Sequence, residues 1–152
     1  PEWLDVDLEV IPGISAMQAG ASRVGAMLGH DFCTISLSDL LTPWETILKR
    51  IEKAGEGDFV VSFYNPVSKK RDWQLNTARD VLLQHRPAST PVLLGRQLTR
   101  PEENVRIIRL DELDAKDVDM FTLVSVGNSE SRHIINGSKE WVYTPRGYKK
   151  KL

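Results

Sequence analysis

The sequence predicts an α/β fold with a mixed, mainly parallel sheet flanked by helices. Three observations predict this class: short apolar or alternating runs typical of strands, helical segments that separate them, and Pro or Gly at many of the junctions. With 152 residues, the chain is long enough to bury a substantial core. We expect residues 1–152 to form a single α/β domain.

The first predicted strand alternates Leu and Val with Asp and Glu over residues 4–10, the period of a half-buried strand. Pro12 and Gly13 end it, because proline lacks a backbone N–H and glycine tolerates turn conformations. Small and apolar residues then predict a helix over 14–28. A helix that begins at the carboxyl edge of a sheet points unpaired N–H groups into the crevice where open α/β sheets bind ligands.

The middle of the chain repeats this alternation of strand and helix. Residues 32–37 alternate and include β-branched side chains, so they predict a strand. A helix over 43–53 is indicated by a capping residue, a first-turn proline and a capping-box glutamate, which are Thr42, Pro43 and Glu45. Residues 58–64 are almost continuously apolar, as expected for a central strand that is covered on both faces.

The second half of the chain adds one helix and three strands. The helix is predicted over 72–85 and is ended by Pro87. Residues 91–98 and 105–110 predict two strands joined by a turn too short for a crossover helix, so we expect them to pair antiparallel. Residues 121–126 predict a last buried strand.

Composition and missing motifs exclude several classes of protein. The net charge of −1 gives no general attraction to nucleic acid, and no apolar run is long enough to cross a membrane, so neither is an expected partner. The one cysteine, Cys33, excludes an internal disulfide and fits a reducing, cytoplasmic compartment. The three histidines lack the spacing of zinc ligands, so no metal site is expected. The phosphate loop GxxxxGK[ST], the dinucleotide fingerprint GxGxxG and the nucleophile elbow GxSxG are absent from the sequence.

Turn residues follow the predicted strands at Pro12-Gly13, Ser38-Asp39, Tyr64-Asn65-Pro66, Gly95-Arg96 and Gly127-Asn128-Ser129. Because the carboxyl ends of parallel strands lie along the same edge of a sheet, these turns are expected to form one ligand-facing rim. Glycine in several of them permits a ligand to approach the main chain closely. We therefore expect the Cα atoms to border one concavity at Gly13, Asn65, Gly95 and Gly127.

The stretch from residue 9 to residue 144 resembles a known family. EVIPGISA at residues 9–16 resembles the helix-opening motif of the tetrapyrrole (corrin/porphyrin) methylases, and DMFTLVSVGNS at 119–129 resembles their last-strand motif. The helix-opening motif alone places only the superfamily. Three longer segments, DFCTISLSDLLTPW, DFVVSFYNPVSKKRDWQL and YTPRGY, resemble the members that act at C(17) of the macrocycle.

The resemblance implies the fold of the C-terminal domain of a two-domain methylase. The implied cosubstrate is S-adenosylmethionine (SAM), which the family binds in a cleft between two α/β domains. The implied reaction is methylation of precorrin-3B, or of cobalt-precorrin-3, at C(17) with ring contraction in cobalamin biosynthesis, and members commonly form homodimers. The family's N-terminal domain is missing from this sequence, which also lacks an initiator methionine. We therefore expect a fragment that carries half of the SAM cleft and is inactive by itself.

The resemblance also implies site residues. The expected SAM contacts form four segments: Pro12, Gly13, Ile14, Ser15 and Ala16; Tyr64 and Asn65; Leu94, Gly95 and Arg96; and Val126, Gly127 and Asn128. A tetrapyrrole substrate carries many carboxylates on a flat apolar ring, and its expected contacts are Asp39, Lys69, Lys70, Arg71 and Arg100. The resemblance indicates no catalytic residue, because methyl transfer from an activated donor needs alignment more than acid–base chemistry.

Other interpretations stay open at this point. Tyr64 is equally well a core aromatic residue, Asp39 a turn residue before a helix, and the basic run at 69–71 a solvated turn. The whole chain has two alternative functions. One is a non-catalytic dimerisation or scaffold domain of such an enzyme, which exposed tryptophans would favour. The other is a generic nucleotide-binding α/β module, for which the sequence offers no phosphate loop.

Overall fold

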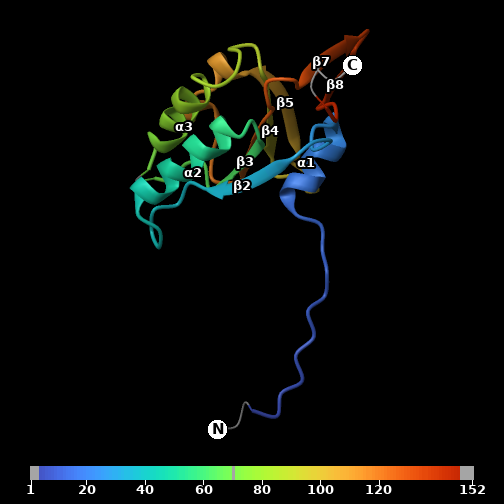
Figure 1. Ribbon diagram of the computed structural model, residues 1–152. Coiled ribbons are helices and arrows are strands. Elements are labelled where there is room, and N and C mark those ends of the chain that lie inside the picture. Colours follow the sequence, from blue (N-terminus) through green and yellow to red (C-terminus); the bar gives the residue numbers. More distant parts are fainter. Residues whose placement is uncertain (1–3, 70, 148–152) are drawn as a thin grey trace.

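The computed structural model describes residues 4–69 and 71–147. A five-stranded sheet lies at the centre and helices pack on both of its faces (Figure 1). The α-helices are α1 (Ala16–Val24), α2 (Trp44–Glu56) and α3 (Gln74–Leu82). The strands of this sheet are β2 (Phe32–Ser36), β3 (Val60–Tyr64), β4 (Pro91–Arg96), β5 (Asn104–Arg109) and β6 (Thr122–Val126). The predicted α/β class, with helices flanking a mixed sheet, is confirmed.

The order of strands in this sheet is β2-β3-β6-β4-β5. β2 and β3 pair in parallel, whereas β6 pairs antiparallel with both β3 and β4, and β4 pairs antiparallel with β5. The predicted hairpin is confirmed, but the expectation of a mainly parallel sheet is wrong. Only two short 3-10 helices, Leu110–Glu112 and Ala115–Asp117, lie between β5 and β6. β5 and β6 both run antiparallel to β4, which lies between them, so the segment with the 3-10 helices carries the chain back across the sheet to the start of β6.

The two faces of the sheet bury separate apolar clusters. On one face Val61 and Phe63 of β3 pack with residues of α2 and α3, and on the other face Val60 packs with Val24 and Met27. These side chains are almost fully buried, and burial of one contributes about 1.5–3 kcal/mol. The strands are therefore held firmly, and the loops at their ends start from fixed positions. Among the described residues, no helix combines the length and apolarity needed to cross a membrane.

The helices differ from the predictions mainly at their ends. Ser15 is the N-cap of α1, and its N–H donates to Oε1 of Gln18 at 2.8 Å, so the helix starts two residues later than expected from Ile14. The predicted cap of α2 is wrong, because Pro43 is the N-cap and makes no side-chain capping bond. The helix α3 is shorter than 72–85, since its last residues form turns up to His85.

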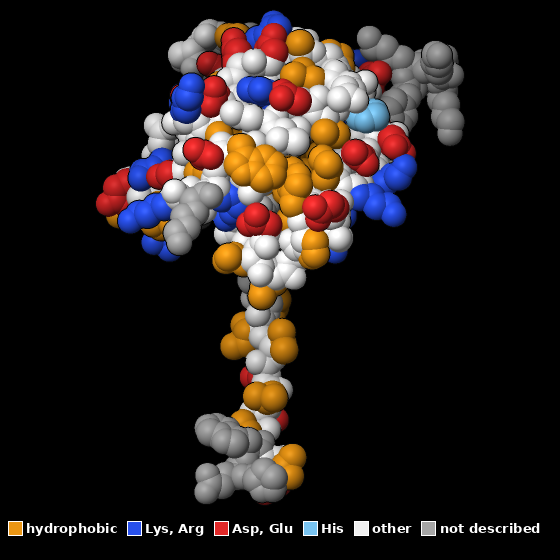
Figure 2. All heavy atoms as spheres, turned by 90° about the vertical axis from the view of Figure 1, so that its left-hand side faces the viewer, with side chains coloured by type: hydrophobic (Ala, Val, Ile, Leu, Met, Phe, Trp, Pro, Cys, Tyr) orange, Lys and Arg blue, Asp and Glu red, His pale blue; other side chains and the backbone are white. Residues whose placement is uncertain are grey.

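The predicted strand over residues 4–10 is absent. Figure 1 shows this segment leading away from the sheet, and no described strand pairs with it. Leu8 is 86% and Val10 92% exposed, and Figure 2 shows apolar side chains along the segment. An alternating pattern produces a strand only where a neighbour accepts the backbone hydrogen bonds. Within the described part of the chain the segment has no such neighbour.

A small second sheet was not predicted. It consists of β1 (Gly25–Ala26), β8 (Lys139–Tyr143) and β7 (Arg132–Asn136), in the order β1-β8-β7. The hairpin of β7 and β8 turns at Gly137, which has a φ of 63°. Gly25, with a φ of 122°, ends α1 and starts β1 directly, which is why the helix predicted over 14–28 stops at Val24.

A substitution at Gly25 tests how closely α1 packs against β8. A Cβ atom built at Gly25 lies 3.0 Å from the carbonyl oxygen of Val142, and the φ of 122° disfavours any side chain. We expect Gly25→Ala to lower the free energy of unfolding by about 1–3 kcal/mol, measured by urea denaturation. Gly13→Ala is the control, because no atom lies within 4 Å of its Cβ position. An equal loss of stability in both variants would contradict the prediction.

Candidate functional site

The ends of β2, β3 and β4 meet at one edge of the sheet, because these three strands run in the same direction. The start of α1 lies at this edge too: the backbone N–H of Met17 donates to the hydroxyl of Tyr64, at the end of β3, over 3.0 Å. Tyr64 is half-buried and ties the two elements together. We call this region the carboxyl edge; it comprises the start of α1 and the loops at 37–40, 65–71 and 97–103.

A cavity of about 200 Å³ opens at the carboxyl edge between α1 and β4. Its lining joins residues that are distant in the sequence, namely Ala16, Gly95, Gln97, Leu98, Arg100, Phe121 and Leu123. The cavity therefore brings together two expected SAM contacts, Ala16 and Gly95, and one expected substrate contact, Arg100. Complete small-molecule sites have volumes of roughly 300–1,000 Å³, so this cavity accommodates part of a ligand.

Backbone strain is concentrated at the carboxyl edge. Four non-glycine residues of the described chain have a left-handed φ, and three of them follow β3 or β4: Asn65 at 52°, Gln97 at 48° and Thr99 at 67°. The fourth, Asp58, precedes β3 at the opposite edge. Such conformations persist only where surrounding contacts hold them, and they cluster at functional sites.

Glu103 holds the loop that follows β4 against α1. Its carboxylate accepts hydrogen bonds from Nε and Nη2 of Arg23 at 2.6 and 3.2 Å, and from the N–H of Thr99 at 2.6 Å. The hydrogen bond from Arg23, and then that from Thr99, lower the pKa of Glu103 below its usual range. The same contact raises the pKa of the Arg23 guanidinium. Both groups are therefore charged at neutral pH, and the strained Thr99 is held in place.

Arg96, an expected SAM contact, makes an ion pair within the protein. Its Nε donates to Oδ2 of Asp119 at 2.7 Å, and Oδ1 of the same carboxylate accepts from the hydroxyl of Thr122 at 2.7 Å. Burial raises the pKa of Asp119, but the hydrogen bonds from Thr122 and Arg96 outweigh it, and the net shift is downward. The pair joins the end of β4 to the start of β6, while the Arg96 side chain stays 43% exposed.

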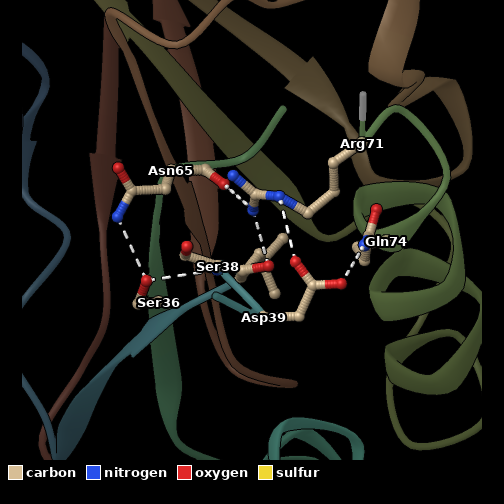
Figure 3. Close-up of polar contacts among 7 residues, drawn as sticks. Ser36, Ser38, Asp39, Asn65, Arg71 and Gln74 are labelled. Atoms are coloured by element: carbon tan, nitrogen blue, oxygen red, sulfur yellow. Dashed lines mark hydrogen bonds and ion pairs between the residues drawn. The ribbon is translucent and has the colours of Figure 1, made fainter. Parts of the chain in front are cut away.

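A second polar cluster lies between the loops that follow β2 and β3 (Figure 3). Nη1 of Arg71 donates to the carbonyl oxygens of Leu37 at 2.6 Å and Asn65 at 2.9 Å, and its Nε lies 3.5 Å from Oδ1 of Asp39. Nε2 of Gln74 donates to the other oxygen of Asp39 at 3.3 Å. The expectation that Arg71 is a surface group for substrate carboxylates is wrong, because main-chain carbonyls bind its guanidinium and only 8% of the residue is exposed.

The turn after β6 lies at the opposite edge of the sheet. The N–H of Gly127 donates to the carbonyl of Pro91, the first residue of β4, at 2.9 Å. A strand that runs antiparallel to its neighbours ends where they begin. The expectation that Gly127 shares one concavity with the other turns is therefore wrong, and so is the assignment to the SAM site of Val126, Gly127 and Asn128.

The other expected residues lie in several places. The expected SAM contacts that precede α1 belong to the exposed extension: Pro12, Gly13 and Ile14. The side chain of Leu94 packs into the cluster with α2 and α3 and does not face the carboxyl edge. Lys69 is exposed in the loop after β3, and Lys70 lies outside the described residues. No group of three or more His, Cys, Asp or Glu side chains is placed to hold a metal ion in the described part of the chain.

Several residues that form or hold the carboxyl edge were not predicted from the sequence: Met17, Arg23, Glu103, Asp119 and Gln74. Arg23 and Glu103 are separated by 80 positions, and no local pattern links such residues. Gln74 had a usable signal. It is 1% exposed and lies on the buried face of α3 with Leu75, Ala78 and Leu82, so a polar residue occupies a core position.

Large apolar side chains are exposed around the loops of the carboxyl edge. Leu40 and Leu41, in the loop after β2, are 85% and 98% exposed. Met120 and Phe121, directly before β6, are 61% and 59% exposed, and the carbonyl of Phe121 accepts from the N–H of Gln97 at 3.1 Å. Clusters of this kind mark surfaces that a ligand or another protein domain covers.

Comparison with known sequences identifies relatives over nearly the whole chain. A model of the tetrapyrrole (corrin/porphyrin) methylases matches residues 1–114. The chain is 49% identical over 148 residues to the precorrin-3B C(17)-methyltransferase of Sinorhizobium sp, covering 97% of this chain and 58% of that protein. It is 48% identical over 145 residues to the probable cobalt-factor III C(17)-methyltransferase of Salmonella typhimurium, covering 95% of this chain and 58% of that protein. The chain thus spans about 58% of the length of these relatives.

Solved structures agree with the sequence relatives. The crystal structure of the methyltransferase CobJ superposes with a TM-score of 0.85 and 40% identity, over 95% of this chain and 59% of that chain. The cobalt precorrin-4 methyltransferase CbiF matches with a TM-score of 0.60 and 14% identity, over 80% of this chain and 52% of that chain, a likeness in fold alone. Family model, sequence identity and fold therefore coincide, and the chain belongs to the tetrapyrrole (corrin/porphyrin) methylase family.

Proposed function

We propose that this chain is the C-terminal half of an enzyme that uses SAM to methylate a tetrapyrrole at C(17), with ring contraction, in cobalamin biosynthesis. The proposed substrate is precorrin-3B or its cobalt-containing counterpart. The names of the relatives from Sinorhizobium sp and Salmonella typhimurium support this reaction. The observation that carries the proposal is one open cavity at the carboxyl edge, where Ala16 and Gly95 meet, with Tyr64 joined to the same end of α1 through the N–H of Met17.

The carboxyl edge fits one side of a SAM molecule. Ala16 and Gly95 are small, so main-chain groups of α1 and β4 are accessible to the polar atoms of a ligand. Leu98 and Leu123 offer apolar surface for an adenine ring. A uroporphyrin-III C-methyltransferase from Thermus thermophilus, similar to this chain in fold, is complexed with S-adenosylhomocysteine, which supports a SAM-like ligand for this fold.

The same edge offers contacts for a tetrapyrrole. The exposed Leu40, Leu41 and Phe121 suit a flat apolar ring. Lys69 and Arg100 are exposed in the loops that follow β3 and β4, and their charges suit its carboxylates. Asp39, whose side chain is 38% exposed, lies at the same loop and completes the proposed substrate contacts.

The proposed reaction depends on the alignment of methyl donor and acceptor carbon more than on acid–base groups. SAM supplies an activated methyl group, and the acceptor carbon must be held within about 3–3.5 Å of it. The strained loops at Asn65 and Thr99 are fixed by hydrogen bonds, so they provide a rigid half of such a cleft. A second domain is needed to cover the exposed edge and exclude water. We propose that this chain alone therefore transfers no methyl group.

We further propose that the whole protein is a cytoplasmic homodimer. The single Cys33 supports a reducing compartment. Trp73 and Trp141 are 47% and 45% exposed, and within the described chain β7 is an edge strand with one unpaired side, which supports a contact between copies. A purely non-catalytic dimerisation or scaffold domain, and a generic nucleotide-binding module, are the competing functions.

Calorimetry with S-adenosylhomocysteine separates these functions. We expect weak binding by the 152-residue chain, because half of the ligand contacts are absent and each ~1.4 kcal/mol of lost binding energy is tenfold in affinity. A fusion protein, with the N-terminal part of the Sinorhizobium relative joined before residue 1, should bind tightly and methylate precorrin-3B. Gly13→Val in the fusion protein should weaken ligand binding without changing the melting temperature, since the space around Gly13 is open.

Three results would contradict the proposal. Efficient C(17) methylation by the 152-residue chain alone would mean that the site lies within these residues. Equal affinity for ATP and S-adenosylhomocysteine would indicate a generic nucleotide module. A fusion protein that dimerises but binds no S-adenosylhomocysteine would indicate a scaffold domain.

The contact between Arg23 and Glu103 predicts a pH dependence of ligand binding. Because the pKa of Glu103 is lowered in the folded protein, the contact stabilises the loop above the unfolded pKa of about 4.3 and is lost as the pH falls through the lower folded value. At pH 7, Glu103→Gln should weaken S-adenosylhomocysteine binding by the fusion protein, and this difference should disappear as the pH falls through the folded pKa of Glu103. Asp111→Asn is the matched control, because Asp111 pairs with Arg109 at 2.7 Å at the end of β5. Equal effects of both variants on binding would contradict the prediction.

A further inference from the structure

We propose that Arg71 and Gln74 are positioning residues that orient Asp39 as a hydrogen-bond acceptor for an N–H group of the tetrapyrrole ring. The inference rests on the proposed function and extends it, because it assigns the side of the cleft that faces the ring nitrogens. The carrying observation is a half-exposed carboxylate that two buried polar side chains hold from behind (Figure 3).

Arg71 joins the loops that follow the two parallel strands. Only 8% of the residue is exposed, and its Nη1 bridges the carbonyl oxygens of Leu37 and Asn65 at 2.6 and 2.9 Å. A buried guanidinium is costly unless its N–H groups find acceptors. Here the acceptors belong to the first residues of both loops, so one side chain joins the loops just beyond the paired ends of β2 and β3. Asn65 is held in its left-handed conformation by the same contact.

The side-chain amide of Gln74 binds Asp39 through its nitrogen, and its oxygen is left without a partner in the described chain. Gln74 is 1% exposed, and its Nε2 donates to Oδ2 of Asp39 at 3.3 Å, while its Oε1 is buried without a hydrogen-bond partner among the residues that the structure describes. Turning the amide over would place Oε1 against the carboxylate, so Asp39 fixes the orientation. A buried acceptor without a partner destabilises the fold, and an apolar side chain of similar shape would avoid this loss. Stability alone therefore does not account for a glutamine at this position.

Asp39 receives both contacts on the protein side and stays 38% exposed. Nε of Arg71 lies 3.5 Å from Oδ1, and Gln74 donates to Oδ2, so each oxygen is engaged once from behind and keeps lone pairs that face outward. The adjoining Leu40 and Leu41 are exposed apolar residues of the same loop. The arrangement is a fixed acceptor at the margin of an apolar surface.

The chemistry of Asp39 selects its partner in the substrate. A carboxylate repels the acidic side chains of the tetrapyrrole and accepts hydrogen bonds from N–H donors. The ring nitrogens are the donors that a tetrapyrrole offers. Asp39 therefore belongs beneath the ring, whereas the cationic Lys69 and Arg100 belong at its acidic periphery.

Three variants of the fusion protein test the inference. Gln74→Met should keep or raise the melting temperature, because it removes the unpartnered oxygen, but should lower kcat/KM for precorrin-3B by about tenfold or more through misplacement of Asp39. Asp39→Asn should lower kcat/KM similarly, and the KM for SAM should stay unchanged in both. Arg71→Lys should in addition speed the hydrogen exchange of the amide protons of Leu37, which donates to Tyr64, and of Ser68, which donates to the carbonyl of residue 71 within the same loop. The reason is that an ammonium group does not bridge three acceptors as a planar guanidinium does.

Arg79→Lys is the matched control. Like Arg71, Arg79 donates to a main-chain carbonyl, that of Leu113 at 2.6 Å, and pairs with a carboxylate, that of Asp80, but it lies within α3 and its carbonyl partner follows β5. It should leave hydrogen exchange at Leu37 and kcat/KM unchanged.

The inference is overturned if Gln74→Met or Asp39→Asn retains wild-type kcat/KM, or if Gln74→Met loses activity only in proportion to lost stability. It is also overturned if Arg71→Lys keeps wild-type exchange in the 152-residue chain, a measurement that needs no ligand. An inactive wild-type fusion protein contradicts the proposed function instead, and the exchange experiment still decides the role of Arg71. If Arg71→Lys does not fold, the kinetics of the other two variants decide.

Discussion

The antiparallel insertion of β6 between β3 and β4 is the constraint on which the candidate site depends. Val126 pairs with both Val61 and Val92, and all three are buried on the face covered by α2 and α3. A slip of one residue would turn this apolar set to the other face, so the register is strongly specified. Because the register is fixed, the start of β6 lies beside the end of β4. Asp119 and Arg96, far apart in the sequence, are thereby brought into contact.

Polar contacts, more than apolar packing, shape the loops beyond the strands. Glu103 binds the N–H of Thr99, and Arg71 binds the carbonyl of Asn65, and both residues have left-handed conformations. Such contacts are directional and fix a backbone geometry that the hydrophobic effect, which has no direction, does not select. The buried, unpartnered oxygen of Gln74 shows that this part of the fold is not optimised for stability alone. The exposed apolar residues around these loops fit a surface that is completed by another domain.

Most secondary structure was predictable because its signals are local. The five strands of the main sheet and the three helices follow from periodicity, proline and glycine within short windows. The hairpin of β7 and β8 also had a signal, Asn136-Gly137 between two apolar runs, which the sequence analysis did not use. Residues 4–10 show the converse: the alternating pattern is present, but a strand needs a partner that the described chain does not provide.

The sequence by itself determined the α/β class, the family resemblance, and three segments of the carboxyl edge, those containing Ala16, Tyr64 and Gly95. Only the tertiary structure decided that Gly127 lies at the opposite edge and that Arg71 is buried between loops. The physical reason is distance along the chain. Apolar periodicity is set by neighbours a few residues apart, whereas strand direction and charge pairing depend on residues tens of positions apart, such as Arg71 and Leu37. Those contacts are selected by the packing of the whole core, and no local pattern encodes them.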